Sequence, residues 1–170
     1  MSYFRAFIGF WKKKTATAAG TLWAWGMGNN GVLGTGLTSS KSSPTQIGVL
    51  NNWADLAAGI SHSLAVKSDG SLWAWGYCNV GQLGDGTIVS KSSPVQIGAL
   101  TNWMNVFCRG SFSVAIKSDG SLWTWGDNSS GQLGIGPADG AIYQLLSSTD
   151  WAHLYSNGTA SSILAQKTDG

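Results

Sequence analysis

The sequence predicts an all-β fold: a partial β-propeller of three blades of short antiparallel strands, preceded by a short N-terminal leader. The first observation is a repeat, because KSDGSLWAWG begins at Lys67 and KSDGSLWTWG begins at Lys117. The second is the composition, with 24 glycines, 10 tryptophans and only 11% charged residues in a chain of 170. Short strands joined by tight turns have such a composition. The chain therefore divides into a leader, residues 1–19, and a propeller region, residues 20–170, with repeats at 20–69, 70–119 and 120–169.

The first strand of each repeat is predicted from a segment that reads LWAWG, LWAWG and LWTWG. Alternation of tryptophan with a small residue fits a strand with a heavily buried face, so we expect at least one tryptophan of each pair to lie buried between blades. Replacing Trp73 by alanine is then expected to cost roughly 3–5 kcal/mol, as a core truncation does. The three segments are Leu22–Gly26, Leu72–Gly76 and Leu122–Gly126.

Turns and further strands follow in a fixed order. Glycine-rich runs come first, and their spacing suits turns with positive φ. An SPxQIG segment, an NW segment and an HSLAVK-type strand come next, and the recurring DG pair makes a tight hairpin into the next LWxWG. Stacked β-coils are the alternative architecture, but their repeats are nearer 20–30 residues. The glycine-rich runs are Asn29–Gly36, Asn79–Gly86 and Asn128–Gly136, and the SPxQIG segments are Ser43–Gly48 and Ser93–Gly98.

The third repeat departs from the pattern. It lacks the KSSPxQIG segment and has PADGAIYQLLSS at Pro137–Ser148 instead. Trp151 falls two residues short of the fifty-residue register, and Gln166 stands where Val66 and Ile116 stand in the other repeats. These changes indicate a specialised or decayed last blade, since terminal repeats are commonly atypical.

No catalytic, cofactor-binding or metal-binding residues are predicted, and we expect no enzyme activity. The two histidines, His62 and His153, occupy non-equivalent repeat positions without ligands at metal spacing, and His62 fits a structural role. The aspartate of each DG pair is explained by its turn. A GxGxxG pattern beginning at Gly26 is not kept in the other repeats, so it indicates no dinucleotide site. Cys78 and Cys108 lie at unrelated repeat positions and suggest no disulfide framework.

The phrase GxLWxWGxNxxGQLGxG, followed by SPxQI, NW and HSLAxKxDG, resembles the regulator of chromosome condensation repeat family. The resemblance runs from Gly20 to Gly170 and recurs three times. It implies a β-propeller whose repeats are phased across blade boundaries, so that the HSLAxKxDG strand and the following LWxWG strand share one blade. The compact, tryptophan-rich form of the repeat is similar to bacteriophage and bacterial members.

This phasing predicts assembly. The first LWAWG lacks the strand that should precede it, and Ser161–Gly170 lacks the strand that should follow it, so both leave unpaired edges. We expect copies to join head to tail, with Ile163–Lys167 of one chain against Leu22–Trp25 of the next. Proline at Ala24 is expected to remove a donor at this junction. The candidate edge residues are Leu22, Trp23, Trp25, Ile163, Leu164 and Gln166.

The leader has an apolar stripe beside positive charge. The simplest interpretation is a tail that docks on its own blades or on those of a neighbour. The alternative binding partners of the leader are an acidic protein surface, a membrane surface and nucleic acid. Because the apolar run precedes the lysines, it has the wrong order for a signal peptide, and no run is long enough to span a membrane. The stripe and its flanking charges comprise Phe4, Phe7, Ile8, Trp11, Lys12, Lys13 and Lys14.

Three functions remain open at this point. The first is a non-catalytic structural or interaction module that assembles through its blades, as a virion component (a phage tail or capsid appendage) or a surface component, with its own copies or other virion proteins as partners. The second is a regulatory propeller that binds chromatin or a GTPase, which the family resemblance implies. The third is a fragment of a longer propeller protein. The net charge of +2 comes largely from the leader, which argues against a nucleic-acid surface on the blades.

Overall fold

Twelve strands form four antiparallel sheets in the structure, a computed structural model that describes residues 19–135, 141–145, 148–155 and 163–168. Two sheets have four strands and are here named the first and second complete blades. The first comprises β3 (Trp53–Ala58), β4 (His62–Lys67), β5 (Leu72–Gly76) and β6 (Lys91–Gln96). The second comprises β7 (Trp103–Arg109), β8 (Phe112–Lys117), β9 (Leu122–Gly126) and β10 (Tyr143–Leu145).

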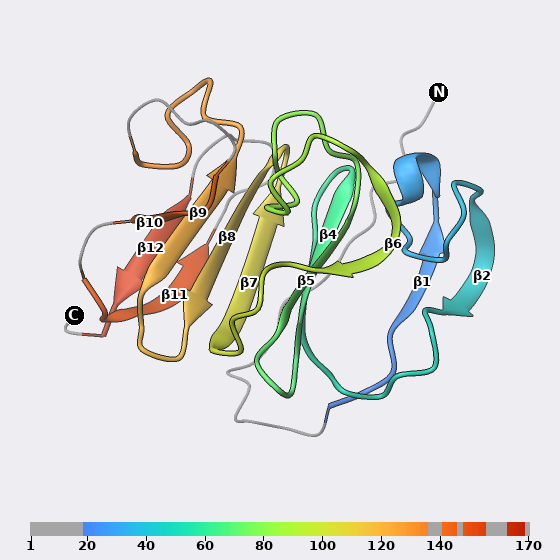
Figure 1. Cartoon of the computed structure of the whole chain (residues 1–170), viewed down its shortest axis with the longest axis horizontal. Coiled ribbons are helices and arrows are strands. Elements are labelled where there is room, and N and C mark those ends of the chain that lie inside the picture. Colours follow the sequence, from blue (N-terminus) through green and yellow to red (C-terminus); the bar gives the residue numbers. More distant parts are fainter. Residues whose placement is uncertain (1–18, 136–140, 146–147, 156–162, 169–170) are drawn as a thin grey trace.

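Two further sheets have two strands each. The N-terminal half-blade pairs β1 (Trp23–Gly26) with β2 (Lys41–Gln46), and a single 3-10 turn, η1 (Asn29–Gly31), lies between them in sequence. The C-terminal half-blade pairs β11 (Trp151–Tyr155) with β12 (Leu164–Lys167). The sheets follow one another along the long axis, with the two half-blades at opposite ends (Figure 1). The all-β, partial propeller fold is confirmed.

Strand register assigns each half-blade a place within a blade. Trp23 pairs with Gln46 as Trp73 pairs with Gln96, so β1 and β2 correspond to the third and fourth strands of a blade. Trp151 pairs with Lys167 in the way that Trp53 pairs with Lys67, so β11 and β12 correspond to the first and second strands. The two half-blades together contain the four strands of one blade.

The DG turn forms the predicted hairpin between β4 and β5. Gly70 has a φ of 79°, and its N–H donates to the Lys67 carbonyl at 2.9 Å. A Cβ at Gly70 would also collide with the carbonyl oxygen of Thr101, so glycine is required there twice over. The Asp69 carboxylate accepts hydrogen bonds from the hydroxyl and the N–H of Ser71, which hold the pKa of Asp69 below its usual value. The same geometry recurs between β8 and β9.

Burial of the LWxWG tryptophans follows the prediction in two pairs and not in the first. Trp75 and Trp125 are buried, whereas Trp73 is only half-buried. Trp23 and Trp25 are both exposed, so the expectation for the first pair is wrong. The reason is that β1 faces no preceding blade among the described residues.

The third repeat retains its fourth strand. Tyr143 pairs with Thr124 as Val95 pairs with Ala74, so the segment YQL takes the place of VQI in the second repeat. The SPxQIG letters are absent from this repeat, as described above, but the strand persists within the replacing segment, without its proline and two residues early. The same two-residue offset places Trp151 in register with Trp53 and Trp103.

Candidate assembly interface

A cluster of one lysine and two tryptophans joins the first three strands of each complete blade. In the first blade, the Trp53 and Trp73 rings meet edge to face with centroids 5.9 Å apart, and Lys67 Nζ lies 3.4 Å from the Trp73 ring centroid. In the second, Trp103 and Trp123 are 6.0 Å apart, and Lys117 Nζ lies 3.7 Å from the Trp123 centroid. Burial lowers the pKa of both lysines, while the ring faces attract the charged amines.

Each half-blade holds one part of this cluster. In the C-terminal half-blade, Lys167 Nζ lies 5.2 Å from the Trp151 ring, the equivalent of Trp53 and Trp103. The N-terminal half-blade supplies the missing ring, because Trp23 stands at the place of Trp73 in the repeat. Trp23 Nε1 donates to Thr21 Oγ1 at 2.8 Å, as Trp73 Nε1 donates to Ser71 Oγ at 2.9 Å. The Trp23 ring therefore has the local support of its counterpart but is 48% exposed.

The backbone bonds show which residues face the outer edge of each half-blade. The Ile47 N–H donates to the Leu22 carbonyl at 2.8 Å, so Leu22 and, by strand alternation, Ala24 face β2. Trp23 and Trp25 consequently face the outer edge. Ala24 is thus the wrong place for a proline at the junction: the substitution would remove a donor on the β2 side instead.

The same alternation applies to β12. The Thr168 N–H donates to the Asp150 carbonyl at 2.8 Å, which places Thr168 on the β11 side. Ile163, Ala165 and Lys167 therefore present their backbone groups to the outer edge. Within the described part of the chain, neither this edge nor the outer edge of β1 has a strand partner.

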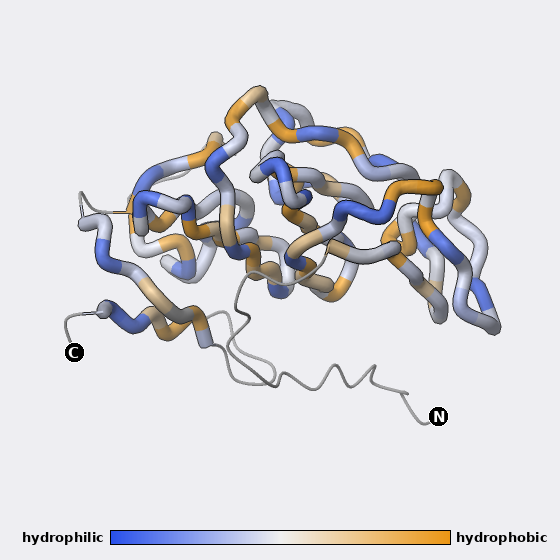
Figure 2. The backbone as a smooth tube through the Cα atoms, turned by 90° about the horizontal axis from the view of Figure 1, so that it is seen from below, coloured by the Kyte–Doolittle hydropathy of each residue, from blue (hydrophilic) through white to orange (hydrophobic). Residues whose placement is uncertain are grey.

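The predicted edge residues differ in exposure. Trp25 is 61% exposed and Leu164 is 68% exposed, whereas Leu22 is buried against the first complete blade. Ile163 is partly buried and Gln166 is exposed. Apolar segments reach both ends of the row of sheets (Figure 2). The leader residues Phe4, Phe7, Ile8, Trp11 and Lys12 to Lys14 lie outside the described residues.

Buried tryptophans seal the junctions between consecutive sheets. Trp75 Nε1 donates to the Val32 carbonyl at 2.9 Å, and Trp125 Nε1 donates to the Gln82 carbonyl at 3.0 Å. A pocket of about 290 Å³ lies at the next junction, between the second complete blade and the C-terminal half-blade. Sequence reasoning missed this pocket, since no motif marks it.

His62 ties the two complete blades together. Ser113 Oγ donates its one hydrogen to the Gln82 carbonyl at 2.7 Å, so it accepts from His62 Nε2–H at 2.9 Å. Burial lowers the pKa of His62 to about 4, which keeps the ring neutral. This geometry agrees with a structural histidine and was not visible in the sequence, because Ser113 carries no motif.

Thiols and metal-ligand side chains are the reactive groups of interest in the described residues. Both cysteines, Cys78 and Cys108, are free and buried, and burial raises the pKa of the Cys108 thiol to about 12. No group of three or more His, Cys, Asp or Glu side chains there could hold a metal ion. No helix in the described ranges is long and apolar enough to cross a membrane.

Consecutive four-stranded antiparallel blades joined through shared repeats define a β-propeller repeat protein. The chain belongs to the Regulator of chromosome condensation (RCC1) repeat family, whose model matches residues 19–66 and 69–116. A second model of the same repeat matches residues 53–82 and 105–132. A search of curated proteins found no significant match.

Solved structures confirm the fold. Human WBSCR16 aligns with a TM-score of 0.66 and 24% identity over 76% of this chain and 34% of its own. Prp20p from Saccharomyces cerevisiae, described with its binding to Gsp1p and histones, aligns with a TM-score of 0.67 and 20% identity. The alignment covers 77% of this chain and 36% of Prp20p. Yeast RCC1 (Prp20) bound to Kap60 aligns with a TM-score of 0.69 and 19% identity, over 85% of this chain and 37% of the yeast chain. The chain therefore spans about a third of the length of these propellers.

Proposed function

We propose that this chain is a non-catalytic interaction module whose copies join head to tail. The C-terminal half-blade of one copy and the N-terminal half-blade of the next supply the first two and last two strands of one blade. This complementarity is the observation that carries the proposal. Apolar, charge-poor outer edges favour such strand addition.

The register of the junction follows from the complete blades. Ala65 pairs with Trp73 across β4 and β5, so Ala165 is expected opposite Trp23 of the next copy. This pairing brings Trp23 toward Trp151 and Lys167, and it would complete the lysine–tryptophan cluster found in both complete blades. A row of unpaired backbone groups and an exposed ring are buried in the same step.

The charges of the blades favour a protein partner over nucleic acid. Lys67 and Lys117 lie against tryptophan rings with 6% exposure each, and Lys91 forms an ion pair with Asp85 at 3.3 Å. These amines are not arranged as a surface stripe for phosphates. A structural component of a virion or a cell-surface assembly is the setting that repeats of this compact type suggest. Density-gradient fractionation of the native source should then place the protein with particles and not with free proteins.

The strand junction is tested with proline at Ala165. This substitution removes an N–H from the outer edge of β12 and leaves the bonds to β11 in place. Light scattering of the full chain should show an assembly for the parent and separate chains for Ala165→Pro. Ala165→Gly keeps the N–H and removes only one methyl group from the pocket lining, so it should assemble far more strongly than Ala165→Pro. A parent that stays monomeric at concentrations up to about 100 µM, or a proline variant that assembles equally well, would overturn the proposal.

A regulatory propeller is the second candidate, because Prp20p is described as binding Gsp1p and histones. The same light-scattering experiment, repeated with purified histones and with a small GTPase, separates the two. Complexes formed by a monomeric parent would favour regulation, and assembly of the parent without either addition would favour the structural role.

A further inference from the structure

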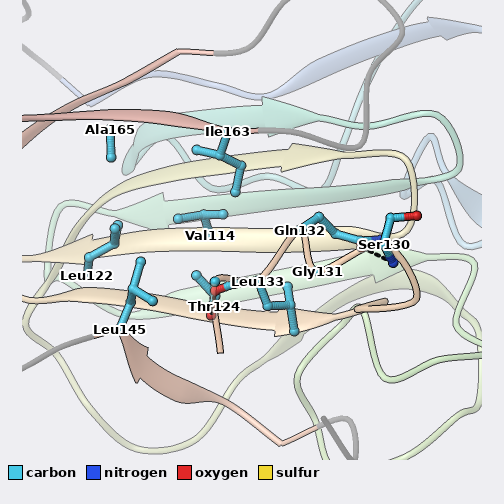
Figure 3. Close-up of a pocket in the computed structure, with 11 residues that line it drawn as sticks. Val114, Leu122, Thr124, Ser130, Gly131, Gln132, Leu133, Leu145, Ile163 and Ala165 are labelled. Carbon is cyan, nitrogen blue, oxygen red and sulfur yellow. Dashed lines mark hydrogen bonds between the residues drawn. The ribbon is translucent and has the colours of Figure 1, made fainter. Parts of the chain in front are cut away.

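The pocket beside the C-terminal half-blade has two dissimilar walls. Ile163 and Ala165 project from the β12 segment toward Val114 and Leu122 of the second complete blade (Figure 3). Leu133 and Leu145 extend the apolar lining on the blade side, and Gln132 and Ser130 lie at one end of it (Figure 3). The cavity of about 290 Å³ is thus mainly apolar, with a polar end.

The corresponding space at the other two junctions is filled by tryptophan. Each of the buried tryptophans shares its core cluster with a leucine and an isoleucine of the preceding sheet and with an alanine of its own sheet. These residues are Leu22, Ile47 and Ala65 around Trp75, and Leu72, Ile97 and Ala115 around Trp125. Their equivalents at the third junction, by strand register, are Leu122, Leu145 and Ala165, and all three line the pocket.

A glycine makes room for the indole at each filled junction. A Cβ on Gly34 would come within 2.8 Å of Trp75 Nε1, and a Cβ on Gly84 would come within 2.8 Å of Trp125 Nε1. Gly134 stands at the same position with the same backbone, since its φ of 67° compares with 73° and 78°. A Cβ on Gly134 would instead meet Leu145 Cδ1 as its nearest atom, at 3.1 Å.

The polar partner of the indole is also in place. Val32 and Gln82 each offer a carbonyl oxygen to a tryptophan Nε1, and the equivalent carbonyl belongs to Gln132, which lines the pocket. In the filled junctions a serine hydroxyl bonds to the same oxygen, from Ser63 and from Ser113. Ile163 replaces that serine at the third junction and adds apolar surface instead.

We propose that Trp25 of a second copy fills this pocket and donates its Nε1–H to the carbonyl oxygen of Gln132. The inference rests on the head-to-tail assembly proposed above. Trp25 occupies the place of Trp75 and Trp125 in the repeat but is exposed on the N-terminal half-blade. Since Ser63 pairs with Trp75 across β4 and β5, the same register sets Trp25 opposite Ile163, at the pocket wall. The half-blades thus carry a knob and a socket as well as matching strands.

Trp25→Ala in the full chain is expected to weaken self-association at least about tenfold, as loss of a buried aromatic anchor does. Sedimentation velocity over a concentration series measures the dissociation constant. Val49→Ala is the control. Val49 is 90% exposed and lies outside the outer-edge strands β1 and β12, so the dissociation constant of Val49→Ala should equal that of the parent. If Trp25→Ala associates as strongly as the parent while Ala165→Pro remains as separated chains, the proposed binding of Trp25 in the pocket is wrong and the proposed strand pairing is supported.

A double-mutant cycle tests the pocket itself. Leu145→Ala removes part of the socket wall, and its effect on the dissociation constant should be markedly smaller when Trp25 is already alanine, because the two side chains contact each other. Effects that multiply independently would show that Trp25 binds elsewhere and would overturn the proposal. A parent that does not associate at any concentration would overturn this proposal together with head-to-tail assembly.

Discussion

Trp25 and Trp125 occupy the same place in the LWxWG segment, and the structure puts them in opposite environments. Trp125 is fully buried against the first complete blade, where its indole N–H is bonded and a glycine makes room for its ring. Trp25 lies on a strand of equivalent register with most of its ring in solvent. The segment therefore specifies a strand and its pairing, while the neighbouring sheet decides whether the ring becomes core.

The largest expected effect separates these two tryptophans. Trp125→Ala should lower the free energy of unfolding by roughly 3–5 kcal/mol, because it leaves a cavity and removes one of the two hydrogen bonds that the Gln82 carbonyl accepts. Trp25→Ala should change it by less than about 0.5 kcal/mol in a single chain, as surface substitutions do. Urea unfolding in the Ala165→Pro background keeps self-association out of the comparison. Equal losses for the two variants would show that the environments are not different in solution.

Acid should loosen the junction that Trp125 helps to form, through His62. Because burial lowers the pKa of His62 to about 4, His62 is protonated in the unfolded chain but remains neutral in the folded chain between pH 6.5 and 4. The contribution is intact above pH 6.5, and the free energy of unfolding should fall by about 3 kcal/mol as the pH drops through this window. His62→Phe places there the side chain that Phe112 has in the next repeat.

The phenylalanine variant serves as the control for this titration. Its free energy of unfolding, measured by urea titration at several pH values, should vary much less between pH 6.5 and 4 than that of the parent. An unchanged pH dependence would assign the effect to other groups.

The repeat made much of this fold predictable. The DG hairpin, the LWxWG strands and the complementary ends all follow from segments that recur with the same letters. The strand β10 could not be read in the same way, because Tyr143–Leu145 shares only its glutamine with VQI and lies two residues early. Pairing with β9 identifies it, and such pairing is a long-range property that the letters do not display.

The candidate interface was predictable only in part. The edge strands could be named from the missing partners, but the direction of each backbone N–H depends on the alternation of bonds with the neighbouring strand. The sequence alone therefore could not show that Ala24 faces β2 and Ala165 faces outward. The His62–Ser113 bond was hidden for a related reason: it joins different positions of two repeats, so periodicity gives no signal for it.

The smallest effect concerns the glycines beneath the two tryptophan positions. Gly84 and Gly134 both have positive φ, so alanine introduces similar backbone strain at each, and the strain cancels in a comparison. At Gly84 the new methyl also meets the rigid indole of Trp125, whereas at Gly134 it meets the flexible end of Leu145. In separated chains, Gly84→Ala should therefore lower the free energy of unfolding by about 1 kcal/mol more than Gly134→Ala, as mild overpacking does.

In the assembly, Gly134→Ala should also have an effect of its own. Trp25 of the next copy would then lie over residue 134, so Gly134→Ala should weaken association. Denaturation in the Ala165→Pro background gives the first comparison, and sedimentation of Gly134→Ala alone gives the second. Association of Gly134→Ala at the parent's strength would mean that no indole enters this junction.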